Sequence, residues 1–403
     1  MTTAVQVQGQ VEAGFEEVRD EFARNFTERG DVGAALAVYV DGAPVVDLWG
    51  GLADPATGRP WERDTVGLVY SATKGATAMV VNLLAERGEL DLDAPVARYW
   101  PEFGAAGKDA VSVTQLLSHQ AGLPVPSAPL TRADLIGGAP VVEALAAQEP
   151  LWAPGTAHGY HALTFGWLTG ELVRRVTGRT LGTVFADEIA RPLDLHFWIG
   201  LPAELSGTVA PLIDGVPDPA ELDLITDPAA KELVLRVVAA MSDPSSLFAR
   251  VLSTNGALPT PHAATWNDPA IHAMEQPAAN GVTNARSLAR LYAACVGEVD
   301  GVRLLSGAAL DRARTEQVRG PDLVTVGESR FGVGFQLPTP ASPLLGEGSF
   351  GHQGAGGALG FGDVSSRVGF GYVQNQLGAS LLGEPRTAAL IAALRRALAR
   401  TRA

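Results

Sequence analysis

Strand-like sequence at both ends of the chain constrains the fold more than any other feature. Two apolar runs, 34–40 and 44–49, flank the pair Asp41-Gly42, which predicts a β-hairpin. Near the other end, short glycine-bounded apolar segments predict four more strands, at 332–337, 349–352, 357–364 and 367–375. The layout predicts α/β structure at both ends of the chain, with a mainly helical insert between them.

The 403 residues exceed what a single compact core usually holds, so two units are expected. We predict an α/β domain built on an antiparallel sheet from residues 1–110 plus 298–403, and a mainly helical domain from residues 111–297. Within the second unit, the proline-broken stretch 202–280 is expected to form loops that cover a pocket. Helical periodicity predicts helices at 11–26, 71–86, 113–118, 134–148, 164–177, 182–189, 231–241, 287–296 and 387–399.

Composition excludes several classes of function. A net charge of −14 argues against nucleic acid and anionic membranes as partners. The chain has no run of 18 apolar residues, so no transmembrane helix is predicted. A single cysteine, Cys295, permits no internal disulfide, and the first ten residues lack the basic and apolar regions of a secretory signal, so a cytoplasmic location is expected. The sequence does not indicate an oligomeric state.

Ser71 and Lys74 form a Ser-x-x-Lys tetrad at the start of a predicted helix. A serine hydroxyl needs a neighbouring base to act as a nucleophile, and side chains three residues apart share one helix face. Desolvation and the positive end of the helix dipole both lower the pKa of a lysine, which then accepts a proton. The alternative is ordinary: an N-cap serine followed by a solvated lysine.

Two later segments supply groups that such a nucleophile requires. Tyr160 lies in a glycine-rich turn just before a predicted helix, where a phenol could relay a proton; the alternative is a buried tyrosine that caps this helix. Four glycines within 351–357 let backbone approach a ligand closely, and the N–H of Ala355 could join that of Ser71 in holding an oxyanion. His352 would project toward the substrate, although a plain glycine-rich strand edge also fits this segment.

Taken in order, Ser71-x-x-Lys74, Tyr160 after a Trp-x-Pro-Gly segment, and His352-Gln-Gly354 resemble the Ser-x-x-Lys, Tyr-x-Asn and Lys-Thr-Gly set of serine β-lactamases and penicillin-binding proteins. The resemblance extends from about residue 15 to the end of the chain. It implies an α+β fold of the β-lactamase/transpeptidase-like, class C type, with an antiparallel sheet flanked by helices and a mainly helical second lobe. The Gly-x-Ser-x-Gly elbow of α/β-hydrolases does not occur, which removes the commonest other esterase fold.

Departures from the family pattern point to a subfamily. Ala162 stands where the pattern has Asn, and His352 and Gln353 stand where it has Lys and Thr. In β-lactamases those side chains help to bind the substrate carboxylate and to release the acyl group, so efficient β-lactam hydrolysis is not expected. The pattern is more similar to the family VIII carboxylesterases, which hydrolyse small carboxylic esters.

The resemblance implies an acyl-enzyme mechanism on a small-molecule ester. Ser71 is then the nucleophile and Lys74 and Tyr160 handle protons, with the base role open between them, while the N–H groups of Ser71 and Ala355 form the oxyanion hole. Substrate contacts are expected at His352, Gly354, Gly356, Trp152 and His161, and Trp266, Phe248 and Leu252 are candidate pocket walls. No cofactor or metal is expected, because His158 and His161 lack an acidic partner.

Other functions stay open on the same residues. The same scaffold serves acyltransferases, amide hydrolases and D-amino-acid peptidases, and weak β-lactamase activity is a further alternative. A catalytically silent binding protein of the same fold is the alternative from another class.

Overall fold

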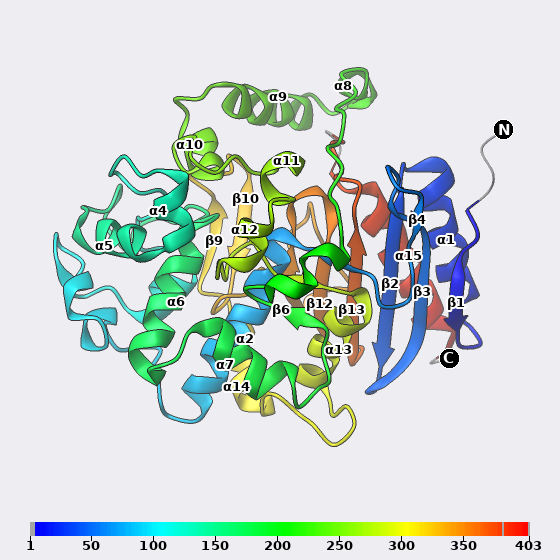
Figure 1. Ribbon diagram of the computed structural model, residues 1–403, viewed down its shortest axis with the longest axis horizontal. Coiled ribbons are helices and arrows are strands. Elements are labelled where there is room, and N and C mark those ends of the chain that lie inside the picture. The colour runs from blue at the N-terminus through cyan, green and yellow to red at the C-terminus, as the bar shows by residue number, and fades with distance from the viewer. Residues whose placement is uncertain (1–4, 381–382, 402–403) are drawn as a thin grey trace.

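The two ends of the chain form one antiparallel sheet in the computed structural model, which describes residues 5–380 and 383–401 (Figure 1). The strand order is β1-β3-β2-β13-β12-β11, and the short β4 pairs with β3. The strands are β1 (Gln8–Val11), β2 (Gly33–Val40), β3 (Ala43–Asp54), β4 (Arg59–Pro60), β11 (Ser349–Gln353), β12 (Leu359–Asp363) and β13 (Val368–Gln374). The predicted α+β fold, an antiparallel sheet flanked by helices, is confirmed.

The predicted hairpin at Asp41-Gly42 joins β2 to β3. Both turn residues have positive φ, 52° at Asp41 and 82° at Gly42, as a two-residue type I′ turn requires. Such a turn matches the right-handed twist of the strands it joins, so this dipeptide fixes the pairing of Val40 with Ala43.

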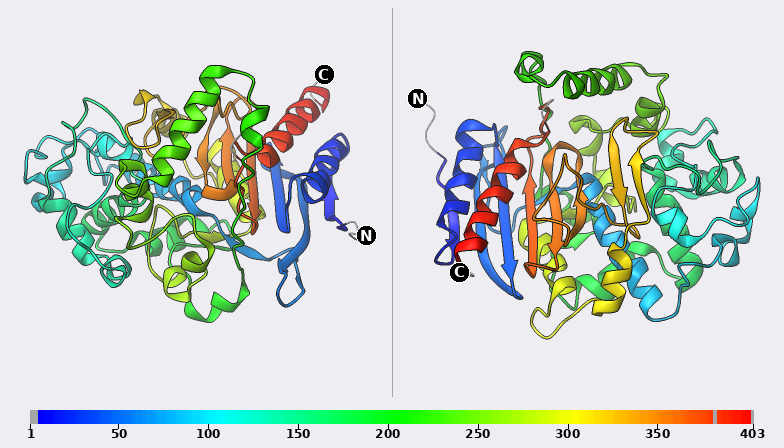
Figure 2. Two further views of the ribbon diagram at one scale, coloured as in Figure 1. Left: turned by 90° about the horizontal axis from the view of Figure 1, so that it is seen from above. Right: turned by 180° about the vertical axis from the view of Figure 1, so that it is seen from behind.

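Helices cover both faces of the sheet. α1 (Glu16–Glu28) and α15 (Pro385–Thr401) pack side by side on one face, and α13 (Ala285–Val296) covers the other (Figure 2). Two glycines of β13 allow α13 to pack closely against the strand. A Cβ at Gly371 would lie 2.3 Å from the Ala285 carbonyl oxygen, and a Cβ at Gly369 would lie 2.3 Å from the Ala289 carbonyl oxygen. Small residues thus let the helix approach the strand closely.

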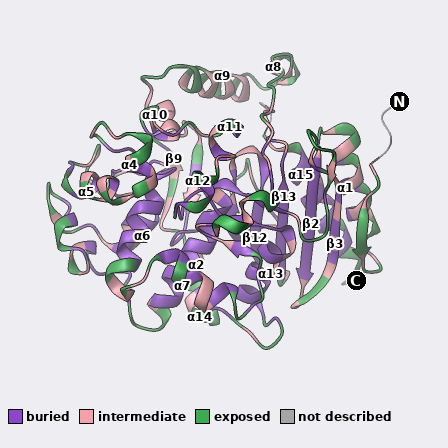
Figure 3. Cartoon of the chain, viewed as in Figure 1, coloured by how far each residue is buried: buried purple, intermediate pink, exposed green. Residues whose placement is uncertain are grey.

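The remaining helices of the described residues all fall between residues 73 and 314. Figure 3 shows that α2 is buried throughout most of its length, whereas α9 is not. These helices are α2 (Thr73–Glu86), α3 (Val113–Leu117), α4 (Arg132–Gly137), α5 (Ala139–Ala147), α6 (Thr164–Thr177), α7 (Leu181–Phe185), α8 (Glu221–Leu224), α9 (Pro228–Ser242), α10 (Leu247–Ser253), α11 (Ala263–Trp266), α12 (Pro269–Ala273) and α14 (Gly307–Arg314).

Three predicted elements were wrong in part, each because a glycine changes the chain direction. The helix expected at 11–26 begins only after Gly14, whose φ is 94°, and Val11 belongs to β1 instead. The helix expected at 134–148 is broken at Gly138, with φ of 75°, into α4 and α5. The strand expected at 332–337 is a bend at Gly334, with φ of 82°.

Short strands that were not predicted position the start of α2. β5 (Val66–Leu68) pairs with β7 (Val209–Ala210) and β8 (Val282–Thr283), and β8 also pairs with β6 (Phe197–Trp198). A hairpin of β9 (Val318–Pro321) and β10 (Glu328–Phe331) lies on the other side of α2.

The domain boundaries at residues 110 and 298 stay predictions. Residues 1–4, 381–382 and 402–403 of the first predicted unit lie outside the described part of the chain. Within the described part, none of the helices combines the length and apolar character needed to cross a membrane.

Candidate active site

Ser71 lies on a tight connection between β5 and α2. Tyr70, directly before it, adopts a left-handed conformation with φ of 44°, and Ser71 follows within a single 3₁₀ turn, Tyr70–Ala72. The Tyr70 ring is buried 5.0 Å from the ring of Trp266, and its carbonyl oxygen accepts a 2.6 Å hydrogen bond from Thr73 Oγ1. These contacts offset the cost of a non-glycine residue with positive φ and direct Ser71 away from the core.

Lys74 lies one turn into the helix region, and its side chain is fully buried. Its Nζ is 3.2 Å from Ser71 Oγ, and it donates hydrogen bonds to the carbonyl oxygens of Ala162 at 2.7 Å and Ala278 at 3.0 Å. Burial lowers the pKa of Lys74 well below its ordinary value, because the charged form loses its hydration.

Tyr160 lies on the other side of Ser71. Both Tyr160 and Ser71 line the same cavity, and Lys74 Nζ lies 4.8 Å from the centre of the Tyr160 ring. The ring stacks on Phe331 at 6.1 Å and lies 5.0 Å from the ring of His119. Desolvation raises the pKa of Tyr160, so the phenol keeps its proton at neutral pH.

The buried carboxylate of Asp322 holds the Tyr160 segment in place. Its Oδ1 accepts hydrogen bonds from the backbone N–H of Tyr160 at 3.1 Å, of Val324 at 2.8 Å and of Thr325 at 2.9 Å. Its Oδ2 accepts a 2.8 Å hydrogen bond from Ser329 Oγ, which lies 2.9 Å from Nε2 of His158. A carboxylate that satisfies several backbone donors fixes the loop that carries them.

The third predicted segment runs along β11 and meets the Ser71 turn. A Cβ on Gly354 would lie 2.1 Å from the Val69 carbonyl oxygen, so only glycine permits this approach. Ala355 follows in a short turn in which Gly356 has φ of 77°.

His352 is buried with its ring 5.9 Å from that of Tyr160. Its Nδ1–H donates to the Gln353 carbonyl oxygen at 2.8 Å, which leaves Nε2 as an acceptor without a partner in the structure. Burial, together with the nearby Lys74, lowers the pKa of His352 to about 3. The imidazole is therefore neutral at physiological pH.

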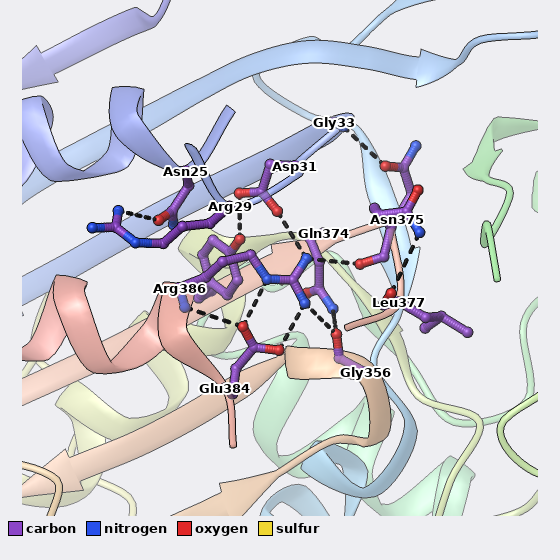
Figure 4. A network of polar contacts seen from close by, with 12 residues as sticks. Asn25, Arg29, Asp31, Gly33, Gly356, Gln374, Asn375, Leu377, Glu384 and Arg386 are labelled. Carbon is purple, nitrogen blue, oxygen red and sulfur yellow. Dashed lines mark hydrogen bonds and ion pairs between the residues drawn. The ribbon is translucent and has the colours of Figure 1, made fainter. Parts of the chain in front are cut away.

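A buried ion-pair network lies beneath this turn (Figure 4). The Gly356 carbonyl oxygen accepts hydrogen bonds from the Arg386 guanidinium at 2.7 Å and from Gln374 Nε2 at 2.7 Å. Arg386 in turn pairs with Asp31 at 3.0 Å and with Glu384 at 2.7 Å, and it is 2% exposed. The turn that carries Ala355 is thus tied through Arg386 to the core of the sheet.

A cavity of about 400 Å³ opens over these groups. Its wall includes Ser71, Tyr160, His352, Gly354, Ala355 and Gly356. Its charged lining side chains are the carboxylates of Asp322 and Glu328.

Trp152 and His161 do not line this cavity. His161 is fully buried behind Tyr160: its Nδ1–H donates to the Gly159 carbonyl oxygen at 2.7 Å and its Nε2 accepts from the Leu123 N–H at 2.9 Å. Burial lowers the pKa of His161 to about 4, so it is neutral. The Trp152 ring lies 6.0 Å from that of His161. Both residues support the backbone around Tyr160.

Of the candidate wall residues, Leu252 lines the cavity and Trp266 is fully buried beneath Tyr70. Throughout residues 5–380 and 383–401, His, Cys, Asp and Glu side chains form no group of three or more with the spacing of a metal site.

Sequence reasoning missed the residues that support the site from behind. Asp322, His119 and Arg386 are distant from the three motifs in sequence and approach them only in the fold. Pro321-Asp322 gives a turn signal, which predicts a local bend and no contact with Tyr160. His119 and Arg386 carry no local signal of this kind.

Comparisons with known proteins match nearly the whole chain. The family model described as Beta-lactamase matches residues 22–394. The esterase/beta-lactamase LipL of Mycobacterium tuberculosis is 39% identical over 350 residues, which cover 85% of this chain and 76% of that protein.

Two solved structures agree with this match, and with the family model they confirm the predicted β-lactamase/transpeptidase-like fold. The crystal structure of a family VIII carboxylesterase is 39% identical with a TM-score of 0.84, covering 97% of this chain and 100% of that one. EstA from Arthrobacter nitroguajacolicus Rue61a is 34% identical with a TM-score of 0.85, covering 99% and 100%.

Proposed function

Because this chain belongs to the beta-lactamase family, we propose that it is a serine carboxylesterase that cleaves small esters through an acyl-enzyme on Ser71. The esterase named among its relatives and the family VIII carboxylesterase structure support this function. The observation that carries the proposal is the position of Lys74 Nζ, 3.2 Å from Ser71 Oγ in a fully buried environment.

The contacts of Lys74 favour it as the base that activates Ser71. A neutral amine has two N–H donors and one lone pair. The two donors match the carbonyl oxygens of Ala162 and Ala278, so the lone pair faces the Ser71 hydroxyl. Tyr160 is a weaker candidate for this step, because its raised pKa keeps the phenol protonated. A protonated phenol is suited to donating a proton to a leaving group.

In the proposed reaction, Ser71 Oγ bonds to the acyl carbon of the ester and its proton passes to Lys74. The N–H groups of Ser71 and Ala355 stabilise the oxyanion of the tetrahedral intermediate. The bond between the acyl carbon and the alcohol oxygen then breaks, and that oxygen takes a proton from Tyr160, which Lys74 reprotonates. Water attacks the acyl-enzyme by the same route, which releases the acid and restores the Ser71 hydroxyl.

The charge of the cavity supports a neutral ester over a β-lactam, whose carboxylate is negative. His352 is neutral where the family pattern places a cationic lysine, and Asp322 and Glu328 line the same cavity. An anionic substrate would therefore meet like charge without a compensating cation in the wall. Hydrolysis of p-nitrophenyl butyrate should exceed that of nitrocefin, and the reverse order would overturn this preference.

The experiment for the function compares Ser71→Ala with Ser245→Ala, a matched change at an exposed serine that does not line the catalytic cavity. Ser71→Ala should abolish hydrolysis of p-nitrophenyl butyrate with the circular dichroism spectrum unchanged, whereas Ser245→Ala should keep wild-type rates. Full activity in Ser71→Ala would contradict the proposal. Adding an alcohol or amine acceptor distinguishes an acyltransferase or a related activity, because transfer products would then exceed the free acid.

A further inference from the structure

A second cavity of about 560 Å³ lies beside the catalytic one. Leu252, Thr260 and Pro261 line both cavities, so the two spaces are neighbours with these three residues between them. The second cavity is lined by α10, the end of α9 and the loop 256–262. Figure 1 shows α9 and α10 at the upper edge of the molecule. Phe248 and Leu252, two of the candidate wall residues from the sequence, line it, and Phe248 does not line the catalytic cavity.

The second cavity has a largely apolar lining. Met241, Phe248, Ala249 and Pro259 contribute to its wall. Arg250, a charged residue, also lines the cavity, and its Nε–H donates a 3.0 Å hydrogen bond to Asn255 Oδ1. Apolar surface of this kind gains free energy when a hydrocarbon group displaces water from it.

Leu252 connects this cavity to the catalytic residues. It packs with Tyr160 in a small apolar cluster built around Val125, Ala162 and Val251. A substrate held at Ser71 therefore has Leu252 beside it, and the second cavity begins on the far side of Leu252.

A third cavity, of about 570 Å³, borders the catalytic one at Gln353 and Gly356, but its lining includes three charged residues, Glu328, Glu384 and Arg395, whereas Arg250 is the one Arg, Lys, Asp or Glu among the described residues that line the second cavity. Charged side chains oppose the burial of a hydrocarbon chain there.

We propose that the cavity between α9 and α10 binds the hydrocarbon chain of the ester, so that the preferred substrates carry a medium-length alkyl chain on the acyl or the alcohol side. This rests on the proposed esterase function and adds a substrate class to it. Phe248, Ala249 and Leu252 then determine chain-length specificity.

The test places a larger side chain in the second cavity at a residue that does not line the catalytic cavity. Ala249 lines only the second cavity, so Ala249→Trp reduces its volume and leaves the lining around Ser71 unchanged. Ala239→Trp is the matched control, because Ala239 is an exposed residue of α9 that lines neither cavity. Phe248→Ala enlarges the cavity, and its effect on chain-length preference can be measured even if Ala249→Trp fails to fold.

Two substrate series separate the two sides of the ester: p-nitrophenyl esters from acetate to decanoate, and acetate esters of alcohols from methanol to octanol. In at least one series, Ala249→Trp should lower the ratio of kcat/KM for the eight-carbon chain to that for the shortest by roughly tenfold or more, the loss expected for about two methylenes. Ala239→Trp should leave the ratio unchanged, and Phe248→Ala should move the preferred length upward. Equal ratios in all four proteins, in both series, would overturn the inference.

Binding of 1-octanol, measured by calorimetry, tests the cavity assignment without requiring ester hydrolysis, so the two proposals can fail independently. Ala249→Trp should weaken it at least about tenfold relative to wild type and Ala239→Trp, the same loss of buried methylenes. If no ester is hydrolysed but octanol binding shows this pattern, the proposed function fails and the cavity assignment stands. If octanol binds all three proteins equally, the cavity assignment fails.

Discussion

The guanidinium of Arg386 donates a 2.7 Å hydrogen bond to the carbonyl oxygen of Gly356, the residue after Ala355. Arg386 belongs to the C-terminal helix α15, whereas Ala355 lines the catalytic cavity. The contact joins the proposed oxyanion-binding turn to the buried Asp31 carboxylate through one side chain.

Arg386→Lys should therefore lower kcat for p-nitrophenyl butyrate by about 10- to 100-fold with little change in KM. Lysine keeps the positive charge beside Asp31 but lacks the fork that reaches Asp31, Glu384 and Gly356 together. A small displacement of an oxyanion donor costs rate more than ground-state binding. Arg396→Lys, at an exposed ion pair with Glu17, is the control and should behave as wild type. An unchanged kcat in Arg386→Lys would show that the network does not position the turn.

Ala355→Pro should remove one oxyanion donor while preserving the turn. Gly354 has φ −93° and ψ 150°, the extended conformation that a residue before proline prefers, and Ala355 begins a short helical turn, where proline is tolerated. The expected loss in kcat is about 10²–10³-fold. Ala355→Ser keeps the N–H and should stay within a few-fold of wild type. Equal rates for the proline and serine variants would remove Ala355 from the oxyanion hole.

Lys74→Met should lower kcat by about 10²–10⁴-fold, the usual contribution of a general base. Its stability effect depends on pH. The folded state binds the Lys74 proton less tightly than the unfolded chain, because burial lowers the pKa. Between the lowered folded pKa and the ordinary unfolded pKa, the unfolded chain binds more protons, so the stability of wild type relative to Lys74→Met rises with pH. Urea unfolding of both proteins at pH 7 and pH 10 measures this difference, and a fall with pH would contradict a neutral buried Lys74.

Asp322→Leu should destabilise the Tyr160 segment and slow the reaction. The change leaves the backbone N–H groups of Tyr160, Val324 and Thr325 without their acceptor, at a cost of about 1–3 kcal/mol for each buried group left unpaired. Asp322→Asn retains one acceptor oxygen and should recover most of kcat and of the free energy of unfolding. If the leucine variant matches the asparagine variant in both kcat and urea midpoint, Asp322 does not position Tyr160.

Local sequence was sufficient to predict much of the fold. Asp41-Gly42 specifies its own turn, and the periodic stretch Thr164–Thr177 forms α6 with the predicted ends. The bend at Gly334 could not be predicted in the same way, since a glycine between apolar residues is compatible with a strand. There the chain packs against α2, and a Cβ on Gly334 would lie 2.7 Å from that of Ala78.

In the candidate site too, local sequence predicted some features and tertiary packing determined the others. Ser71, Tyr160 and Ala355 lie within motifs whose order predicted a common site, and the structure brings them to one cavity. Trp152 and His161 lie in the same motif segment as Tyr160 but behind the cavity, because burial and hydrogen bonds direct His161 toward Gly159 and Leu123. Which side of a loop faces a pocket depends on tertiary packing, which motif spacing does not encode.

The most direct test of the central claim is the intact mass and peptide map of the protein after reaction with a serine-directed phosphonate ester. We predict one adduct per chain, located on Ser71, with labelling that is absent in Ser71→Ala and slowed in Lys74→Met. An adduct on any other residue, or no adduct on the wild-type protein, would contradict the assignment of Ser71 as the nucleophile.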